Sequence, residues 1–280
     1  MALKLMYITN NADVASIAEK AGVDRIFLDM EFIGKDSRQK GLDTVKNHHT
    51  IEDIRRVRKV LTKAELLVRC NPIHDKIDDY YSSREEIEEI IDAGADIIML
   101  PFFKTILEIE KFLTLVNGRA KTMLLLETPE AVSIIDDILK LDGIDEIHVG
   151  LNDLSLGLGK SFMFELLEDG TIEYLSNKFH ENQMPFGFGG IAALGEGKLP
   201  AEKIIKEHYY FGSSIVILSR SFCNVDKCHS IGEVAEKFFF GIKEIRSFEE
   251  ECLMHKNYFD KNRIEIRKII EDFYDEQRKV

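Results

Sequence analysis

Two acidic residues, Glu127 and Asp153, follow short apolar runs at the point where a buried strand would end. The runs are 121–126 and 147–149, and a helical pattern lies between them. Two strands joined by such a helix run parallel, so the two acids should emerge side by side. Paired carboxylates with room for water suit a hard divalent cation, Mg²⁺ or Mn²⁺. The alternative is a pair of helix-capping or salt-bridging acids, although capping does not explain an acid that ends an apolar strand.

The helix between these strands is expected to be continuous. Pro129 suits its first turn, because the ring fixes φ near the helical value, and Gly143 marks its end. One stripe of this helix is apolar and comprises Val132, Ile135, Ile138 and Leu139.

Arg69 closes another apolar run, Glu65–Cys70, and is the candidate substrate-binding residue. Its planar guanidinium can hold a carboxylate or a developing enolate oxygen. Asp29 and Glu31 follow the run 25–29, so a buried ion pair with Arg69 is the alternative, and both roles can hold together.

The turn Gly150-Leu151-Asn152 begins a helix and supplies backbone N–H groups that can bind an anion. A metal ion, an arginine and these N–H groups would together form a pocket for a small 2-oxo acid. The metal would polarise the keto oxygen, and the N–H groups would hold the carboxylate.

A long polar loop, 32–49, follows the second strand and is a candidate lid. It ends in His48 and His49, just before a helix that Thr50 and Asp53 can cap. The two histidines are either solvated loop residues or a proton-transfer group.

Short apolar runs alternate with helical patterns eight times, which predicts a (β/α)₈ TIM barrel. A doubly wound sheet is the second candidate, but the first turn lacks the glycines of a phosphate-binding fingerprint. The predicted strands are Lys4–Thr9, Arg25–Asp29, Glu65–Cys70, Asp96–Pro101, Lys121–Glu127, Glu146–Gly150, Pro185–Gly189 and Ser214–Ser219.

Beyond residue 220 the pattern is wholly helical. We assign 1–230 to the catalytic barrel and 231–280 to the last barrel helix with a helical extension. The first apolar face comprises Val234, Phe238, Phe239, Ile242 and Ile245. The second, Ile266, Ile269, Ile270, Phe273 and Tyr274, should pack across the barrel base or, preferably, on another subunit of a homo-oligomer.

The 280 residues carry 37 basic and 50 acidic side chains, a net charge of −13, which argues against nucleic acid or an anionic membrane as partner. No run has transmembrane length, and the start lacks a signal peptide. The four cysteines have no disulfide-scaffold spacing. A cytoplasmic protein with a small-molecule substrate fits these features.

From Ile17 to Gly159 the chain resembles the HpcH/HpaI aldolase and citrate lyase β-subunit family. Its motifs AGVDRIFLDMEF, LVRCNP, IDAGADIIMLP, LLLETPEAV and GIDEIHVGLNDLSLGLG are similar to those of the family in order and spacing. The resemblance implies a metal-dependent barrel that makes or breaks a carbon–carbon bond through a pyruvate- or acetyl-type enolate. It also implies that Glu127 and Asp153 bind the metal, that Arg69 binds substrate, and that the C-terminal helices exchange between subunits.

Phe32 departs from the family. The pyruvate aldolase branch has a histidine there and the citrate lyase branch a second acid. We therefore expect a carbon–carbon lyase or aldolase for a 2-oxo acid, with two alternatives: a malyl- or citramalyl-thioester lyase, or a non-catalytic metabolite-binding barrel. The candidate catalytic residues are Asp29, Glu31, His48, His49 and Arg69.

Overall fold

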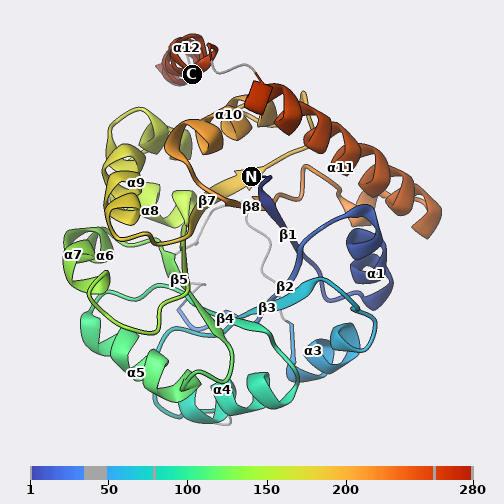
Figure 1. Ribbon diagram of the computed structural model, residues 1–280, viewed down its shortest axis with the longest axis vertical. Helices are drawn as coiled ribbons and strands as arrows, with labels where there is room; N and C mark the ends of the chain where they lie inside the picture. Colours follow the sequence, from blue (N-terminus) through green and yellow to red (C-terminus); the bar gives the residue numbers. More distant parts are fainter. Residues whose placement is uncertain (1, 35–48, 78–79, 255–256, 279–280) are drawn as a thin grey trace.

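The computed structural model describes residues 2–34, 49–77, 80–254 and 257–278. Eight parallel strands form a closed barrel in sequence order, with β1 paired to β8 and helices around the outside (Figure 1). This confirms the predicted (β/α)₈ barrel. The strands are β1 (Lys4–Ile8), β2 (Arg25–Asp29), β3 (Glu65–Arg69), β4 (Ile97–Leu100), β5 (Lys121–Leu126), β6 (Glu146–Val149), β7 (Phe186–Ile191) and β8 (Ile215–Leu218).

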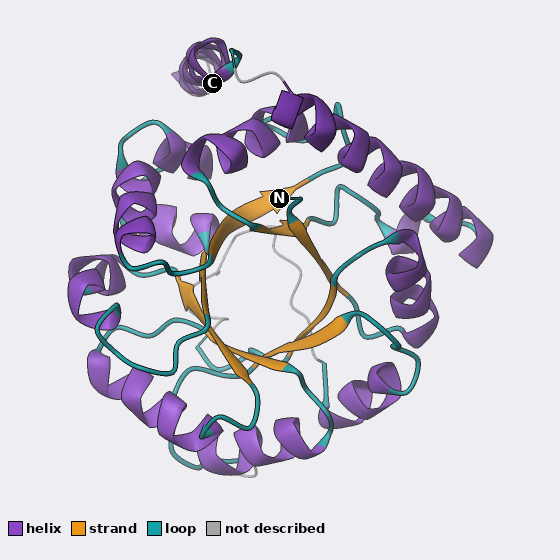
Figure 2. Cartoon of the chain, viewed as in Figure 1, coloured by secondary structure: helices purple, strands orange, loops and turns teal. Residues whose placement is uncertain are grey.

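The helices lie on the outer surface of the strand ring (Figure 2). Those described are α1 (Ala12–Ala21), α3 (Ile51–Arg58), α4 (Ser83–Asp92), α5 (Ile106–Val116), α6 (Pro129–Ser133), α7 (Ile135–Ile138), α8 (Leu151–Gly157), η1 (Met163–Leu167), α9 (Thr171–Glu181), α10 (Ala201–Phe211), η2 (Val225–Lys227), α11 (Ile231–Met254) and α12 (Phe259–Arg278). No described helix is both long and apolar enough to cross a lipid bilayer.

Ion pairs close the barrel interior at the amino ends of the strands. The buried Arg25 guanidinium donates from Nη2 to Glu146 and from Nε to Glu65, each at 2.8 Å. Above this network lies a cluster of buried apolar side chains. They are Met6, Phe27, Leu67, Ile97, Met99, Met123, Leu125 and Ile215. Polar side chains at the carboxyl ends of the strands therefore rest on a dry, filled core.

The helix after β5 differs from the prediction, because it is broken into α6 and α7 at Ile134. Ile134 has φ −108° and ψ 16°, outside the helical region. The Ser133 hydroxyl donates to the Glu130 carbonyl oxygen at 2.6 Å. Both this local bond and the β-branched side chains nearby weaken a continuous helix.

Most of the predicted apolar face of α11 is buried, but Phe239 is half exposed. The buried positions follow the helical repeat from Val234 to Ile245, and Phe239 lies about 100° around the helix from its neighbour Phe238. Its assignment to the buried face was therefore wrong.

The extension α12 packs on the outside of α10 and η1 of its own chain rather than across the barrel base (Figure 1). Ile266 is buried there, and the Asn262 amide donates to the Lys203 carbonyl oxygen at 3.1 Å and to Glu207 at 2.7 Å. Part of the face that we assigned to another subunit therefore has a partner within the chain. Oligomerisation stays a prediction.

The start of β1 is held from the far end of the chain. The Leu3 backbone N–H donates to Glu249 Oε1 at 2.7 Å, and Arg246 donates to the Leu3 carbonyl oxygen at 2.8 Å. Both side chains belong to α11, so this helix fastens the first strand.

Glu207, between α10 and α12, should make stability depend on pH. Burial raises the pKa of this carboxyl to about 7, so the folded protein keeps a proton that the unfolded chain loses near pH 4.5. The resulting stability is complete below pH 4.5 and is lost as pH rises through 7.

We expect wild type to lose about 2 kcal/mol between pH 5.5 and 8.5 relative to Glu207→Gln, measured by chemical denaturation. Glu181→Gln, at an exposed acid of α9, is the control and should follow wild type. Parallel pH profiles for wild type and Glu207→Gln would contradict the prediction.

Candidate active site

A cavity of about 210 Å³ opens at the carboxyl ends of the strands. Six of the predicted site residues line it together: Arg69, Glu127, Gly150, Leu151, Asn152 and Asp153. Its apolar wall comprises Ile8, Phe27, Met99, Leu125, Met163 and Ile217. Residues that are far apart in sequence meet here because closure of the barrel gathers the strand ends.

Glu127 follows β5 and is buried with 3% of its surface exposed. The Phe102 backbone N–H donates to its Oε1 at 3.1 Å. Gly150 lies directly against it, since a Cβ at Gly150 would come within 2.9 Å of both Glu127 Cβ and Oε2. The glycine therefore makes room for the carboxylate beside the start of α8.

Asp153 lies in the first turn of α8 and is partly buried. The described residues form no hydrogen bond or ion pair with its carboxylate, and it lines the same cavity as Glu127. Nor do they form a cluster of three or more acidic, cysteine or histidine side chains that could hold a metal. Two carboxylates, with water and substrate as further ligands, match the oxygen donors of Mg²⁺ or Mn²⁺.

Arg69 is fixed by a two-pronged ion pair. Its Nε and Nη2 donate to the two Asp29 oxygens at 2.8 and 2.7 Å, and its Nη1 lies 3.3 Å from Glu31. Burial acts to lower the pKa of Arg69, but the charges of Asp29, Glu31 and Glu127 outweigh it and raise the pKa well above its ordinary value. The guanidinium is therefore permanently charged and held in one orientation.

Asp29 and Glu31 do not line the cavity but orient Arg69, which does. The ion pair that we considered as an alternative role for Arg69 is present. Arg69 nevertheless lines the cavity, and it has further N–H groups besides the two that donate to Asp29.

His49 of the second loop does not line this cavity. His49 Nδ1 accepts from the Asp29 backbone N–H at 2.9 Å, and the ring lines a separate cavity of about 400 Å³. His48 lies outside the described residues. Phe32 packs edge-on against Tyr80, with ring centroids 4.7 Å apart.

His148 lines the cavity and was missed from the sequence. It lies in β6, and its exposed surface is only 1%. Burial lowers its pKa to about 4, so the ring is neutral at neutral pH. The available signal was a histidine inside an apolar strand, two residues before Gly150 and hence on the same face.

One wall of the cavity is connected to the C-terminal extension. Met163 begins η1, and the preceding Phe162 stacks on Phe273 of α12 with ring centroids 4.4 Å apart. Arg267 of α12 also contacts Glu168 at 2.9 Å. The extension thus supports a segment that forms the site.

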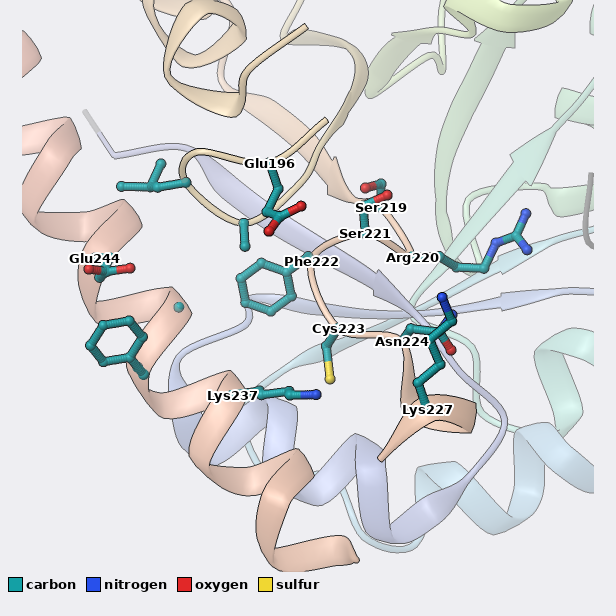
Figure 3. A pocket seen from close by; sticks show the side chains of 14 residues that line it. Glu196, Ser219, Arg220, Ser221, Phe222, Cys223, Asn224, Lys227, Lys237 and Glu244 are labelled. Carbon is teal, nitrogen blue, oxygen red and sulfur yellow. The ribbon is translucent and has the colours of Figure 1, made fainter. Parts of the chain in front are cut away.

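A larger cavity of about 830 Å³ lies beyond the ends of β7 and β8. Figure 3 shows Arg220, Asn224 and Lys227 toward one side of it, with Glu196 and Glu244 toward the other. Within the described part of the chain neither Arg220 nor Lys227 forms an ion pair.

Comparison with known proteins identifies relatives of this barrel. A family model described as HpcH/HpaI aldolase/citrate lyase matches residues 4–165, more than half of the chain. An HpcH/HpaI aldolase from Desulfitobacterium hafniense is similar at 16% identity and a TM-score of 0.57, over 78% of this chain and 86% of that one.

Two further solved structures share the fold. An HpcH/HpaI aldolase/citrate lyase family protein from Burkholderia cenocepacia has 13% identity and a TM-score of 0.58, over 78% of this chain and 88% of that one. A variant of the citrate synthase SbnG has 18% identity and a TM-score of 0.51, over 78% and 86%. No curated protein matches the sequence significantly.

Gly150→Ala should destabilise the protein. The new Cβ would lie 2.9 Å from Glu127 and force it to move, and such overpacking costs about 1–3 kcal/mol. We expect a fall of several degrees in Tm, measured by calorimetry.

Gly232→Ala is the matched control, because its Cβ meets only Ser230 Oγ at 3.6 Å within the first turn of α11. This change should leave Tm unchanged or raise it, since alanine favours a helix. Equal shifts for the two variants would contradict the close contact between Gly150 and Glu127.

Proposed function

The chain belongs to the HpcH/HpaI aldolase/citrate lyase family, and we propose that it is a divalent-metal-dependent carbon–carbon lyase that acts on a 2-oxo acid through a pyruvate-type enolate. The observation that carries this proposal is the single cavity lined by Glu127, Asp153 and Arg69. The two carboxylates supply oxygen ligands for a metal ion, and the Arg69 guanidinium supplies a positive charge for an anionic substrate.

The charges at the barrel mouth support a metal. One guanidinium faces four carboxylates, those of Asp29, Glu31, Glu127 and Asp153. An anionic substrate would be repelled by this excess of negative charge, and a divalent cation offsets it.

The residues have separate roles in this proposal. Mg²⁺ or Mn²⁺ bound by Glu127 and Asp153 would supply the positive charge that stabilises an enolate. Arg69, held by Asp29, presents its remaining N–H groups to a substrate oxygen. The backbone N–H groups of Leu151 and Asn152, in the first turn of α8, would contact a small carboxylate, whereas the Gly150 N–H already donates to the Leu126 carbonyl oxygen at 2.9 Å.

A thioester substrate is the second candidate, and the larger cavity favours it. Arg220 and Lys227 could bind the phosphates of a coenzyme A-type carrier while the acyl group reaches the site across the ends of β7 and β8. Glu196 and Glu244 in the same cavity oppose a polyanion, so we rank this candidate second.

The proposed function predicts metal-dependent exchange of the pyruvate methyl protons with D₂O, measured by NMR. Glu127→Gln and Asp153→Asn should each lower the exchange rate by about 10²-fold or more, because each removes a proposed metal ligand. Glu130→Gln is the control, since Glu130 is an exposed acid paired with Lys104 at 2.8 Å.

Exchange that persists in both ligand variants would overturn the metal site. Binding of metal and pyruvate without exchange, and without cleavage of any 4-hydroxy-2-oxo acid, would instead identify a non-catalytic metabolite-binding barrel.

The thioester candidate predicts cleavage of a malyl- or citramalyl-thioester by the wild-type protein. Arg220→Met with Lys227→Met should then lower kcat/KM for the thioester by roughly tenfold per lost phosphate contact, while pyruvate exchange is retained. Failure of the wild-type protein to cleave either thioester would remove this candidate.

A further inference from the structure

Two of the four cysteines lie together beyond the end of β8, and neither lines the cavity of the candidate active site. Cys223 is buried, Cys228 is partly buried, and both contact the same apolar core. The short helix η2 between them turns the chain back, since the Cys228 backbone N–H donates to the Val225 carbonyl oxygen at 3.0 Å. The two thiols are close enough to share a hydrogen bond.

The surroundings of the two thiols differ. Burial is the main cause that raises the pKa of Cys223 to about 11, so this thiol stays protonated at neutral pH. Cys228 Sγ instead accepts a hydrogen bond from the Lys237 ammonium at 3.4 Å. The Cys228 thiol also donates to the Asn224 carbonyl oxygen at 3.4 Å, a weak bond that it gives up when it loses its proton. A neighbouring lysine is typical of thiols that react as nucleophiles, so Cys228 is the candidate attacking thiol.

Lys237 is held in place beside this thiol. It lies in α11 and forms an ion pair with Glu233 one turn earlier, at 2.9 Å. The hydrogen bond to Glu233 is the main cause that raises the pKa of Lys237, so its amine is charged at neutral pH. The ammonium therefore remains available to offset the negative charge of an attacking sulfur.

The larger cavity gives a small molecule room beside the two cysteines. Cys223 and Lys237 both line this cavity of about 830 Å³, and Figure 3 shows the Cys223 side chain pointing toward the Lys237 amine. Cys252 provides a contrast within the same helix. It is buried and lies 15 residues beyond Lys237 in α11, about 22 Å along the helix axis.

We propose that Cys223 and Cys228 form a reversible disulfide by exchange with a small disulfide of the glutathione type, so that this pair is a redox modification site separate from the proposed metal site. The Cys228 thiolate attacks one sulfur of the small disulfide and releases its other half as a thiolate. Cys223 then gives its proton to water, attacks the Cys228 sulfur and releases the second half. Two protein thiols are oxidised, and the small disulfide is reduced to two thiols that take up the two protons.

The test treats the full chain with oxidised glutathione and maps the products by mass spectrometry. The wild-type protein should lose the mass of two hydrogen atoms and carry no glutathione. Trypsin cuts after Arg220, Lys227 and Lys237, so the disulfide should join the peptides 221–227 and 228–237 until dithiothreitol separates them.

Single variants distinguish the two cysteines. Cys223→Ala should retain glutathione on Cys228, because no second thiol is left to displace it. Cys228→Ala should acquire neither glutathione nor a disulfide at Cys223, because the remaining thiol is buried and protonated. Cys252→Ala is the control and should follow the wild-type protein.

Lys237→Met keeps both cysteines and therefore tests the site without a change in the buried core. It should slow formation of the disulfide by roughly two- to fivefold, the size of an exposed charge interaction. Lys243→Met, at an exposed lysine of the same helix, is the matched control and should react at the wild-type rate.

A wild-type protein that keeps all four thiols, or that retains glutathione on Cys228, would overturn this inference. A Cys228→Ala variant that reacts like wild type would also overturn it. Equal rates in Lys237→Met and Lys243→Met would remove Lys237 from the reaction.

Discussion

Pairing of β1 with β8 closes the barrel, and every feature of the candidate site depends on that closure. Because all eight strands are parallel, their carboxyl ends lie on one face, which brings together residues as distant in sequence as Asp29 and Asp153. An open sheet would leave β1 and β8 at opposite edges and the cavity without part of its wall. The chemistry therefore depends on hydrogen bonds between the first and last strands.

Charge is distributed along the barrel axis in a definite order. Ion pairs around Arg25 close one end, an apolar layer fills the middle, and the pair of Arg69 with Asp29 stands at the mouth. The apolar layer keeps water from the inner side of the mouth, so electrostatic interactions there are strong. The same apolar layer makes it energetically unfavourable to bury the polar ring of His148 there.

The fold was predictable because buried parallel strands are continuous apolar runs, and a residue that ends such a run must lie at the mouth. That reasoning reached Arg69, Glu127 and Asp153. It did not predict the break in the helix at Ile134, because that break depends on local backbone preferences. Nor did it predict where α12 packs, because α12 contacts residues such as Phe162 that are distant in sequence. His148 was passed over although it interrupts an apolar strand two residues before Gly150, whereas its burial and its place in the cavity wall are visible only in three dimensions.

The attachment of Leu3 to α11 has a consequence for biosynthesis. Leu3 and Glu249 are 246 residues apart, and at about 5–20 residues per second the ribosome needs roughly 12–50 s to make the chain between them. For most of that time neither β8 nor α11 has been made, so the edge of β1 that pairs with β8 is open, and an unpaired strand edge readily joins another chain. Slower translation lengthens the period in which this edge is open, so we expect the yield of correctly folded protein to fall as translation slows.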